Sequence, residues 1–242
     1  MSERQELDQR YSRNLNTLSP QDQEKLGKSR VAILGLGGLG GGVCELLART
    51  GVGALTLIDG DSFDISNLNR QLMCLEDNIG HSKAQEAAKR VKKVNATVQT
   101  TVFQAYAGPD NLKQMIENAD IVVDCLDTIQ ARLHLQDAAD ALGIPLVSGA
   151  IAGVTGQVTV IFPGDPGFER IYGDILRDRA DGNLENRGIE TWAGNLSFCA
   201  SFIASLQAAE TVKVLIGKGK TLRNKLLIAD LWTNTLEVMD LE

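Results

Sequence analysis

The chain has 242 residues, of which 43% are hydrophobic, and its 24 Lys and Arg against 31 Asp and Glu give a formal net charge of −7. This size and composition predict a single domain over residues 1–242 with one sizeable core, and the negative charge argues against nucleic acid as the main partner. No apolar run approaches 18 residues and the start, MSERQELDQR, is charged, so we expect no membrane span, no secretory signal and a cytoplasmic protein.

Strands and helices alternate through the first two thirds of the chain, after an N-terminal helical arm over residues 1–29. Val31–Leu34 and Ala54–Ile58 are short apolar runs typical of buried strands, and a helical pattern between them ends near Gly51. The pattern then predicts a helix over Ser82–Val94, a strand over Thr97–Phe103, a short helix over Asn111–Asn118, a strand over Asp120–Asp124, a helix over Thr128–Leu142 and a strand over Pro145–Ser148. This order predicts a Rossmann-like α/β fold, with a mostly parallel sheet and helices on both faces.

The C-terminal third departs from this alternation. Gln157–Phe162 has the pattern of a strand without a crossover helix before it, so we expect an antiparallel extension of the sheet. A long apolar helix is predicted over Asn195–Ile216, and a final hairpin over Leu226–Asp230 and Thr235–Met239. Residues 164–194 combine Gly, Pro and charges of both signs without an apolar period, which predicts a long irregular segment.

A glycine-rich turn, Gly35-Leu-Gly-Gly-Leu-Gly-Gly-Gly42, separates the first strand from the first helix, and the second strand ends at Asp59. This is the order in which a dinucleotide-type fold holds a nucleotide. Glycine lets the backbone approach phosphate oxygens, the free N–H groups of the helix start attract negative charge, and the acid accepts hydrogen bonds from ribose hydroxyls. The predicted nucleotide contacts from these segments are Gly35, Gly37, Gly38, Gly40 and Asp59.

The residues after Asp59 favour a triphosphate over a nicotinamide cofactor. A polar loop carries Asn67 and Arg70, and Lys83 opens the next predicted helix. Arginine offers a planar fork of donors to phosphate oxygens, and lysine adds a second cation. Taken singly, Arg70 and Lys83 are each better explained as solvated surface charges. Together, behind a glycine turn and an acid, they predict a triphosphate site.

Several of these segments resemble the ThiF/MoeB/HesA family, the bacterial relatives of ubiquitin-activating enzymes. The matching segments are GLGGLG, LIDGDSFDISNLNRQ, GHSK and DCLD, together with Arg10-Tyr-Ser-Arg13, which matches the opening RY-x-R signature, and the SLQA segment that starts at Ser205. The resemblance runs from about Arg10 to Leu241. It implies an adenylyltransferase that uses ATP and magnesium to activate the C-terminal glycine carboxylate of a small ubiquitin-like sulfur-carrier protein of the ThiS or MoaD type, as in thiamine or molybdopterin biosynthesis.

The resemblance also assigns roles to residues. It implies catalytic roles for Arg13, Arg70, Lys83 and Asp127, and further nucleotide contacts from Asp61, Ser66, Asn67 and Thr128. In relatives the arginine that matches Arg13 reaches the nucleotide of the neighbouring subunit, which implies a homodimer with shared sites; from the sequence alone Arg13 is an exposed charge of the N-terminal arm. In relatives the segment that matches 164–194 crosses over the site, and a hairpin like the C-terminal one helps to bind the carrier.

Asp127 has two interpretations. It follows the carboxyl end of the strand over Asp120–Asp124, where ligands of open α/β sheets lie, so it suits a magnesium ligand facing a triphosphate. Aspartate is also a favoured N-cap, and a helix is predicted from Thr128. The residues alone do not separate the two. The resemblance favours the metal ligand, because Asp127 is the second Asp of the family's DC-x-D motif, and it leaves Asp124 to support the loop.

The four cysteines, Cys44, Cys74, Cys125 and Cys199, form no CxxC pair. Many ThiF/MoeB relatives hold a structural zinc with two such pairs, so we expect no structural zinc here. Some relatives carry a reactive cysteine in the segment that crosses the site. Counting back from the SLQA segment puts that position near Glu190, so we expect no thiolate chemistry there, and Cys74 is the best remaining thiol.

Two other functions are compatible with parts of the sequence. A glycine turn followed by an acid also occurs in NAD-dependent oxidoreductases, although this chain has no recognisable hydride-transfer residue. A non-catalytic module that binds nucleotide or carrier would show the same motifs. Exchange of pyrophosphate into ATP, compared with NAD binding, separates these possibilities from adenylyl transfer.

Overall fold

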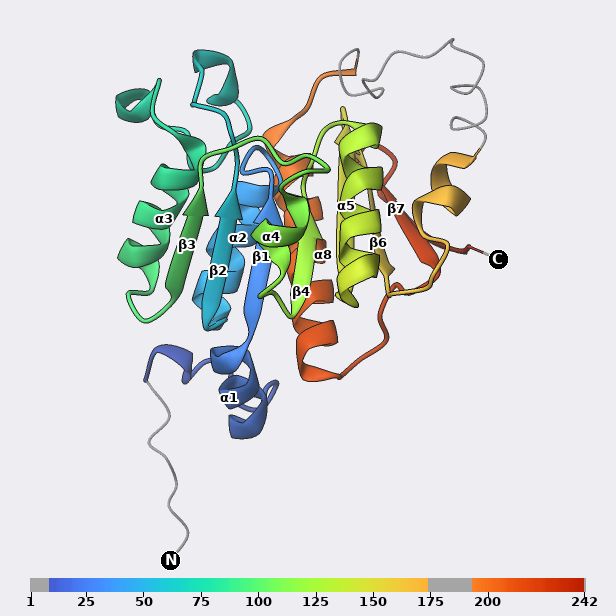
Figure 1. Cartoon of the computed structure of the whole chain (residues 1–242), viewed down its shortest axis with the longest axis horizontal. Helices are drawn as coiled ribbons and strands as arrows, with labels where there is room; N and C mark the ends of the chain where they lie inside the picture. Colours follow the sequence, from blue (N-terminus) through green and yellow to red (C-terminus); the bar gives the residue numbers. More distant parts are fainter. Residues whose placement is uncertain (1–8, 174–192, 242) are drawn as a thin grey trace, which may run out of the picture.

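The structure, a computed structural model, describes residues 9–173 and 193–241 (Figure 1). Within this part of the chain, eight strands form one sheet in the order β3-β2-β1-β4-β5-β6-β7-β8. The strands are β1 (Arg30–Leu34), β2 (Ala54–Ile58), β3 (Gln99–Phe103), β4 (Ile121–Asp124), β5 (Leu146–Ala152), β6 (Thr155–Ile161), β7 (Lys225–Asp230) and β8 (Thr235–Asp240). The helices are α1 (Pro20–Lys28), α2 (Gly40–Thr50), α3 (Lys83–Val94), α4 (Leu112–Ile116), α5 (Ile129–Leu142) and α8 (Ser197–Ile216), with 3-10 turns η1 (Gln9–Tyr11), η2 (Ile65–Asn67) and η3 (Glu76–Asn78).

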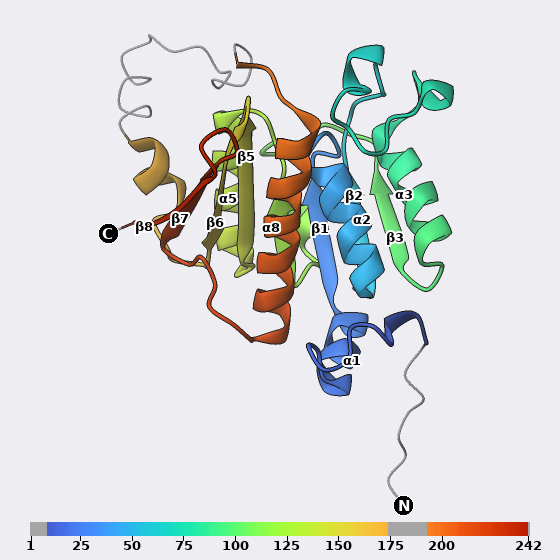
Figure 2. The same ribbon diagram turned by 180° about the vertical axis from the view of Figure 1, so that it is seen from behind.

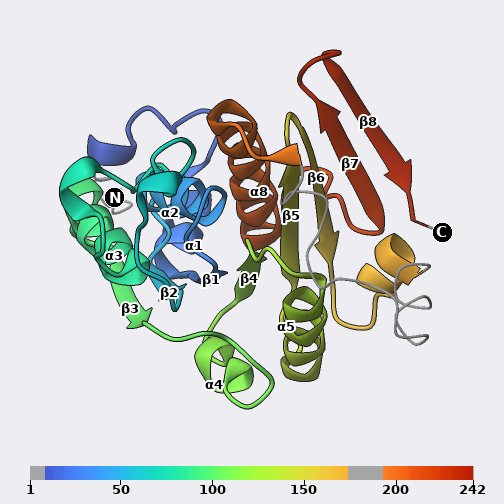
Figure 3. The ribbon, with the colours of Figure 1, turned by 90° about the horizontal axis from the view of Figure 1, so that it is seen from above.

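The sheet is parallel from β3 to β5 and antiparallel from β5 to β8. Helices α2, α3 and α8 cover one face, and α4 and α5 cover the other (Figure 3). Alternate residues of β1 enter the two cores: Val31 and Ile33 pack on the first face, Ala32 and Leu34 on the second. The predicted fold class is therefore confirmed, including the antiparallel extension.

Two regions differ from the sequence prediction. β5 continues four residues beyond Ser148 to Ala152, because residues 149–152 pair with residues 155–158 across a tight turn in which Gly153 has φ +62°. Residues 168–173 are helical where an irregular segment was expected. There Phe168 is buried and its ring lies 5.6 Å from that of Tyr172 on the next turn, so an apolar pair four residues apart supports the helix. Residues 174–192 of the predicted crossover segment lie outside the described part of the chain.

Helix α8 is a core helix. Its length and apolar composition would suit a membrane span, but half of its apolar window is buried inside the protein. It packs against α2, β5 and β6, beside α2 on the same face of the sheet (Figure 2). A Cβ on Gly42 of α2 would lie 2.8 Å from the Cβ of Ala204, so glycine in α2 allows the two helices to approach closely.

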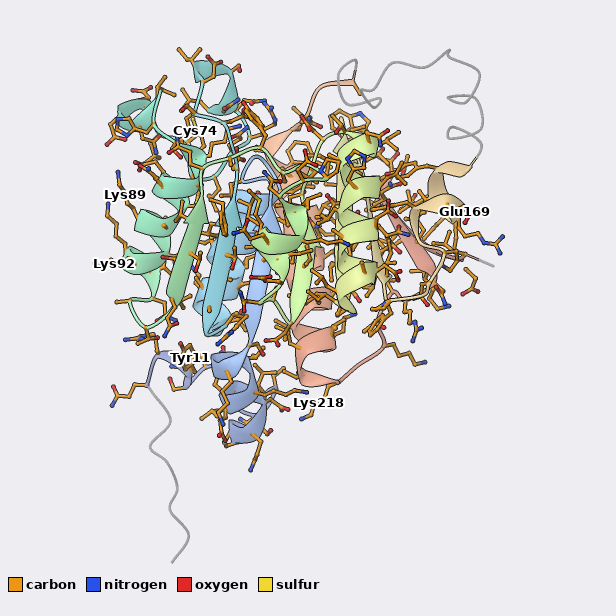
Figure 4. The ribbon with its side chains drawn as sticks, in the orientation of Figure 1. Tyr11, Cys74, Lys89, Lys92, Glu169 and Lys218 are labelled. Carbon is orange, nitrogen blue, oxygen red and sulfur yellow. The ribbon has the colours of Figure 1, made fainter. Side chains whose placement is uncertain are left out.

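The N-terminal arm lies at the end of the sheet opposite the carboxyl ends of the parallel strands (Figure 1). Helix α1 starts with a capping box between Ser19 and Asp22. Before it, Arg10 donates to Asn95 Oδ1 at 2.8 Å, and Asn95 donates to the Tyr11 hydroxyl oxygen at 2.7 Å. In Figure 4 Tyr11 lies at this lower end and Cys74 at the upper end of the molecule. These bonds fasten the arm to the end of α3.

Candidate active site

The carboxyl ends of β1, β2, β4 and β5 surround a cavity of about 480 Å³. Ligands of open α/β sheets bind at this edge. The cavity is lined by nine of the residues that the sequence nominated, from five different segments of the chain: Gly35, Gly37, Gly38, Asp59, Asp61, Asn67, Arg70, Lys83 and Asp127.

The glycine turn has the backbone that its residues predict. Gly35 has φ +82°, and a Cβ there would lie 2.6 Å from the carbonyl oxygen of Cys125. Gly40 does not line the cavity. It is needed because a Cβ there would come within 1.8 Å of the Gly35 carbonyl oxygen. Leu39, the N-cap of α2, makes no side-chain capping bond, so its side chain leaves the first N–H groups of this helix available to a ligand.

Asp59 ties the glycine turn to the end of β2. Its Oδ2 accepts the Leu36 N–H at 2.6 Å, and its Oδ1 accepts the Asp61 N–H at 2.8 Å. Burial raises the pKa of Asp59 above its usual range, in spite of these two donors. Each oxygen keeps a lone pair for a further donor, so the carboxylate can still receive ribose hydroxyls.

Lys83 and Asp61 form an ion pair on the cavity wall, with Nζ 2.9 Å from Oδ2. The Tyr106 hydroxyl donates to the other oxygen of Asp61 at 2.6 Å. Burial favours a raised pKa for Asp61, but the hydroxyl and the ammonium outweigh it and hold the pKa below its usual value. Tyr106 was missed by the sequence reasoning. Its position directly after β3, at the same edge of the sheet, is the signal that would have found it.

Asn67 and Arg70 come from the polar loop between β2 and α3. Asn67 is buried, and its Oδ1 accepts the Asp64 N–H at 3.1 Å, which holds η2 in place. Arg70 donates to the Ser66 carbonyl at 3.2 Å and to Asn69 Oδ1 at 2.9 Å. Its Cγ lies 3.6 Å from where a Cβ on Gly38 would be, so the side chain passes over the glycine turn.

The structure shows which residue caps helix α5, and this tests one of the two interpretations of Asp127. Helix α5 is capped by Thr128, whose hydroxyl accepts the Ala131 N–H at 3.3 Å. The interpretation of Asp127 as the cap is therefore wrong. Asp127 is exposed, lines the cavity and has no hydrogen-bond or ion-pair partner among the described residues. Its carboxylate is left for a ligand.

Asp124 supports the loop, as expected. It is fully buried, its Oδ2 accepts the Ser148 hydroxyl at 2.6 Å and pairs with Arg132 at 3.1 Å, and its Oδ1 accepts the Leu126 N–H at 3.0 Å. Arg132 also donates to the Leu126 carbonyl and lines the cavity. The sequence reasoning did not select Arg132, since a single arginine in a helix gives no sign of a buried partner.

Four nominated residues do not line the cavity. They are Gly40, Ser66, Thr128 and Arg13. Gly40 and Thr128 serve the two helix starts described above. Ser66 is exposed and offers its backbone oxygen to Arg70. Arg13 is exposed in the arm at the far end of the sheet, so within one chain it is remote from the nucleotide residues.

The thiols are poorly placed for chemistry. Cys44, Cys74 and Cys199 are buried and Cys125 is half-buried. Burial raises the pKa of all four, which disfavours the reactive thiolate. In residues 9–173 and 193–241 no three His, Cys, Asp or Glu side chains gather into a metal cluster.

This fold defines an α/β protein of the nucleotide-binding kind, and its cavity is lined by the cations Arg70 and Lys83 and by Asp127, which has no partner among the described residues. The chain belongs to the ThiF family, whose model matches residues 11–242. It is an E1-like adenylyltransferase of that family.

Two curated relatives match along most of their own length. The molybdopterin-synthase adenylyltransferase of Escherichia coli is 35% identical over 224 residues, which cover 90% of this chain and 86% of that protein. The SAMP-activating enzyme E1 of Haloferax volcanii is 32% identical over 232 residues, which cover 95% and 84%. The chain spans about half (49%) of a longer relative, the adenylyltransferase and sulfurtransferase MOCS3-1 of Zea mays.

Solved structures share the fold at lower identity. E. coli MccB with AMPCPP and MccA superposes with a TM-score of 0.81 at 23% identity, over 98% of this chain and 72% of that one. The E. coli tRNA N6-threonylcarbamoyladenosine dehydratase TcdA, in complex with ATP, has a TM-score of 0.73 at 23% identity, over 86% and 94%.

Proposed function

We propose that this protein uses ATP and magnesium to adenylate the C-terminal glycine carboxylate of a small ubiquitin-like sulfur-carrier protein of the ThiS or MoaD type, acting as a cytoplasmic homodimer. The observation that carries the proposal is the cavity itself, where the cations Arg70 and Lys83 lie around a glycine turn with Asp127, whose carboxylate has no partner in the described part of the chain. The relatives named for molybdopterin synthase and for SAMP activation support the class of substrate.

The nucleotide residues divide by chemistry. The start of α2 and the glycine turn offer backbone N–H groups to phosphate oxygens, and Asp59 offers carboxylate oxygens to the ribose hydroxyls. Asn67, Arg70 and Lys83 lie beyond them and bring hydrogen-bond donors and positive charge to the triphosphate. For this, Lys83 has to share its ammonium between Asp61 and phosphate, which its three N–H donors permit.

The residues also fit a magnesium ion. Mg²⁺ with nucleotides is typically held by one or two carboxylates, with phosphate oxygens and waters completing the octahedron. Asp127 supplies one exposed carboxylate with no competing partner among the described residues. Bound there, the ion would offset the repulsion between Asp127 and the phosphates and neutralise charge on the departing pyrophosphate.

The reaction needs no general base. A C-terminal carboxylate is ionised at pH 7, and one of its oxygens attacks the α-phosphorus of ATP. The bond from that phosphorus to the bridging oxygen breaks, pyrophosphate leaves, and the carrier becomes an acyl adenylate. This chain therefore contributes positioning and charge stabilisation rather than proton transfer, which agrees with the buried, raised-pKa thiols.

The proposal also assigns roles to two features outside the cavity, Arg13 and the β7–β8 hairpin. Arg13 would act on the nucleotide of the neighbouring subunit, since it is exposed and remote from the cavity of its own chain. The carrier would dock on the β7–β8 hairpin, where Leu236, Val238 and Met239 are exposed and the Trp232 ring stacks on Phe198 at 6.3 Å. Exposed apolar patches of this kind commonly mark protein-binding surfaces.

The proposal is tested by incubating the purified protein with ATP, magnesium and candidate ThiS-type and MoaD-type carriers. We expect carrier-dependent exchange of labelled pyrophosphate into ATP, and a carrier whose mass has increased by one AMP. A carrier without its terminal glycine is the control and should give neither signal. Nucleotide binding without exchange for any carrier would instead indicate a binding module, and NAD binding in place of ATP would indicate an oxidoreductase.

A further inference from the structure

Lys83 is held on the cavity wall by a single residue. Its side chain is only 9% exposed, and its Nζ lies 2.9 Å from Oδ2 of Asp61. Its backbone N–H also donates to the Asp61 carbonyl at 3.0 Å. In the described part of the chain, Asp61 is the only carboxylate within ion-pair distance of Nζ. An ammonium that a carboxylate holds firmly is less available to phosphate oxygens, so the strength of this pair affects any anion bound in the cavity.

The other oxygen of Asp61 is occupied by a residue from a different segment of the chain. Tyr106 follows β3, which lies beside β2 at the edge of the sheet (Figure 1). Its hydroxyl donates to Asp61 Oδ1 at 2.6 Å, so Asp61 binds a phenol with one oxygen and an ammonium with the other. All three residues line the cavity. They therefore form one hydrogen-bonded chain on its wall.

The hydroxyl is not needed to hold the loop that carries it. The Tyr106 carbonyl accepts Asn111 Nδ2 at 3.0 Å, and the Gly108 N–H donates to Asn111 Oδ1 at 2.8 Å. Tyr106 is 74% exposed, so it buries little apolar surface. A Cβ on Gly60 would come within 2.8 Å of the Tyr106 ring, so glycine allows the ring to lie directly over the loop that carries Asp61. This position serves the bond to Asp61 rather than packing in the core.

A hydrogen bond donated to a carboxylate satisfies part of its negative charge. Burial favours a raised pKa for Asp61, but the phenol and the ammonium hold the pKa below its usual value. In return, the bond to Asp61 raises the pKa of Tyr106, so the phenol keeps its proton at neutral pH. Two effects follow, and both favour an anion in the cavity. Asp61 attracts the Lys83 ammonium less strongly, and its own charge repels phosphate less.

We propose that Tyr106 is a positioning residue of the triphosphate site: its hydroxyl partly neutralises Asp61 and so makes the Lys83 ammonium available to phosphate. The inference rests on the proposed function and deepens it, because it states how Lys83 can serve a carboxylate and a nucleotide at once. Without the hydroxyl, Asp61 would keep Lys83 as its partner and would present a more negative oxygen to the phosphates.

The first test is Tyr106→Phe, which keeps the ring and removes only the hydroxyl. We expect the Kd for ATP with magnesium to rise about threefold to tenfold, which corresponds to the loss of one hydrogen bond. The Kd for adenosine, measured by its competition with ATP, should stay constant because adenosine has no phosphate. An unchanged Kd for ATP would overturn the proposal. An equal loss for both ligands would also overturn it, since Tyr106 would then contact the nucleoside.

Tyr172→Phe is the matched control. The Tyr172 hydroxyl accepts Gln157 Nε2 at 3.2 Å, and Tyr172 does not line the cavity. Its loss removes a phenol hydrogen bond of the same kind elsewhere in the protein, so the Kd values for ATP and adenosine should equal those of the wild type.

The second test asks whether Tyr106 acts through the charge of Asp61. Asp61→Asn keeps an oxygen that can accept the phenol but removes the charge, and its own Kd for ATP is the reference. In this background Tyr106→Phe should change the Kd by less than about twofold, because the two residues act as a unit. A loss as large as in the wild-type background would show that the hydroxyl only holds its loop, and would refute the proposal. Thermal unfolding checks the fold of each variant.

The binding measurements need no carrier protein, which separates the two proposals. If the wild type binds ATP but exchanges no pyrophosphate with any carrier, the proposed function fails and the role of Tyr106 is still tested. If exchange occurs, Tyr106→Phe should raise the KM for ATP about threefold to tenfold and leave the KM for the carrier nearly constant. A wild-type KM for ATP in that variant would refute the role of Tyr106 alone.

Discussion

Thr128, and not its neighbour Asp127, caps helix α5, with its hydroxyl 3.3 Å from the Ala131 nitrogen. The two residues divide tasks that either residue type can perform. Because the hydroxyl satisfies the helix start, the adjacent carboxylate is exposed in the cavity without a partner in the described part of the chain. Thr128 therefore serves the stability of the helix and Asp127 is available for catalysis, so a substitution at each position tests one role without the other.

Asp127→Ala should abolish pyrophosphate exchange and leave the fold intact, since it removes an exposed carboxylate and no core volume. The measurement is exchange at several magnesium concentrations, with thermal unfolding as the check on the fold. Thr128→Ala is the matched variant and should lower the free energy of unfolding by about 1 kcal/mol. Normal exchange by Asp127→Ala at ordinary magnesium concentrations would remove Asp127 from the metal site.

Arg13→Ala and Asp127→Ala should each be nearly inactive as homodimers, if Arg13 completes the site of the partner subunit. A mixed dimer of the two variants has one site with both residues intact, so it should recover about half of the activity of a wild-type dimer. The assay is pyrophosphate exchange after verified subunit exchange. If a proven mixed dimer stays inactive, Arg13 does not act across an interface.

Metal analysis of the purified protein should find well under one zinc per chain, because the sequence has no CxxC pair. Strong chelators should leave its melting temperature unchanged. Tightly bound zinc at one equivalent would contradict this and would require ligands outside any CxxC pattern.

Replacing all four cysteines with Ala or Ser should leave adenylation intact, since burial raises the pKa of each thiol. We expect packing losses of about 1 kcal/mol or somewhat more at Cys44, Cys125 and Cys199, where core volume changes. Formation of carrier-AMP is measured together with folding. A folded Cys74 variant that still makes the adenylate but no longer passes the carrier onward would identify a working thiol.

Asp22 should stabilise the folded protein more strongly above about pH 4 than near pH 2. The Lys218 ammonium, 2.5 Å away, and Ser19 lower the pKa of Asp22 to about 2 in the folded protein. A carboxyl whose pKa is lowered by folding stabilises the protein above its unfolded pKa of 3.8, and this contribution is lost as the pH falls toward 2. The free energy of unfolding, measured with a chemical denaturant across this pH range, should fall less steeply toward low pH in Asp22→Asn and in Lys218→Ala than in the wild type. An equally steep fall in the variants and the wild type would show that the ion pair does not stabilise the protein in solution.

Much of the fold was predictable because its signals are local. The run Ala54–Ile58 is β2 without any change of boundary, and Gly51 and Gly143 end α2 and α5 in the left-handed conformation that glycine favours. The pairing of β5 with β6 was harder to locate, since three of the four residues 149–152 are Gly or Ala, which give no strand pattern until their partners are known. The helical residues 168–173 were missed because they depend on the burial of Phe168 against distant segments.

The cavity was predictable where a motif or a strand end marks the residue, as for Gly35, Asp59 and Asp127. It was not predictable where a role depends on a partner far away in the chain. Arg132 is recognisable only once Asp124 and Ser148 lie beside it. The binding roles of the nominated residues remain predictions, and the variants above test them.

The contact between Gly42 and Ala204 has a consequence for engineering this protein. A Cβ at Gly42 would stand 2.8 Å from that of Ala204, so even Gly42→Ala would wedge α2 and α8 apart over a contact deep in the core. The separation between the two helices is thus set by the missing side chain of Gly42 in the first turn of α2. Attempts to widen the cavity should therefore change its rim and leave this glycine alone, because a shift of a few tenths of an ångström here would move α2, and the glycine turn that leads into it, relative to α8.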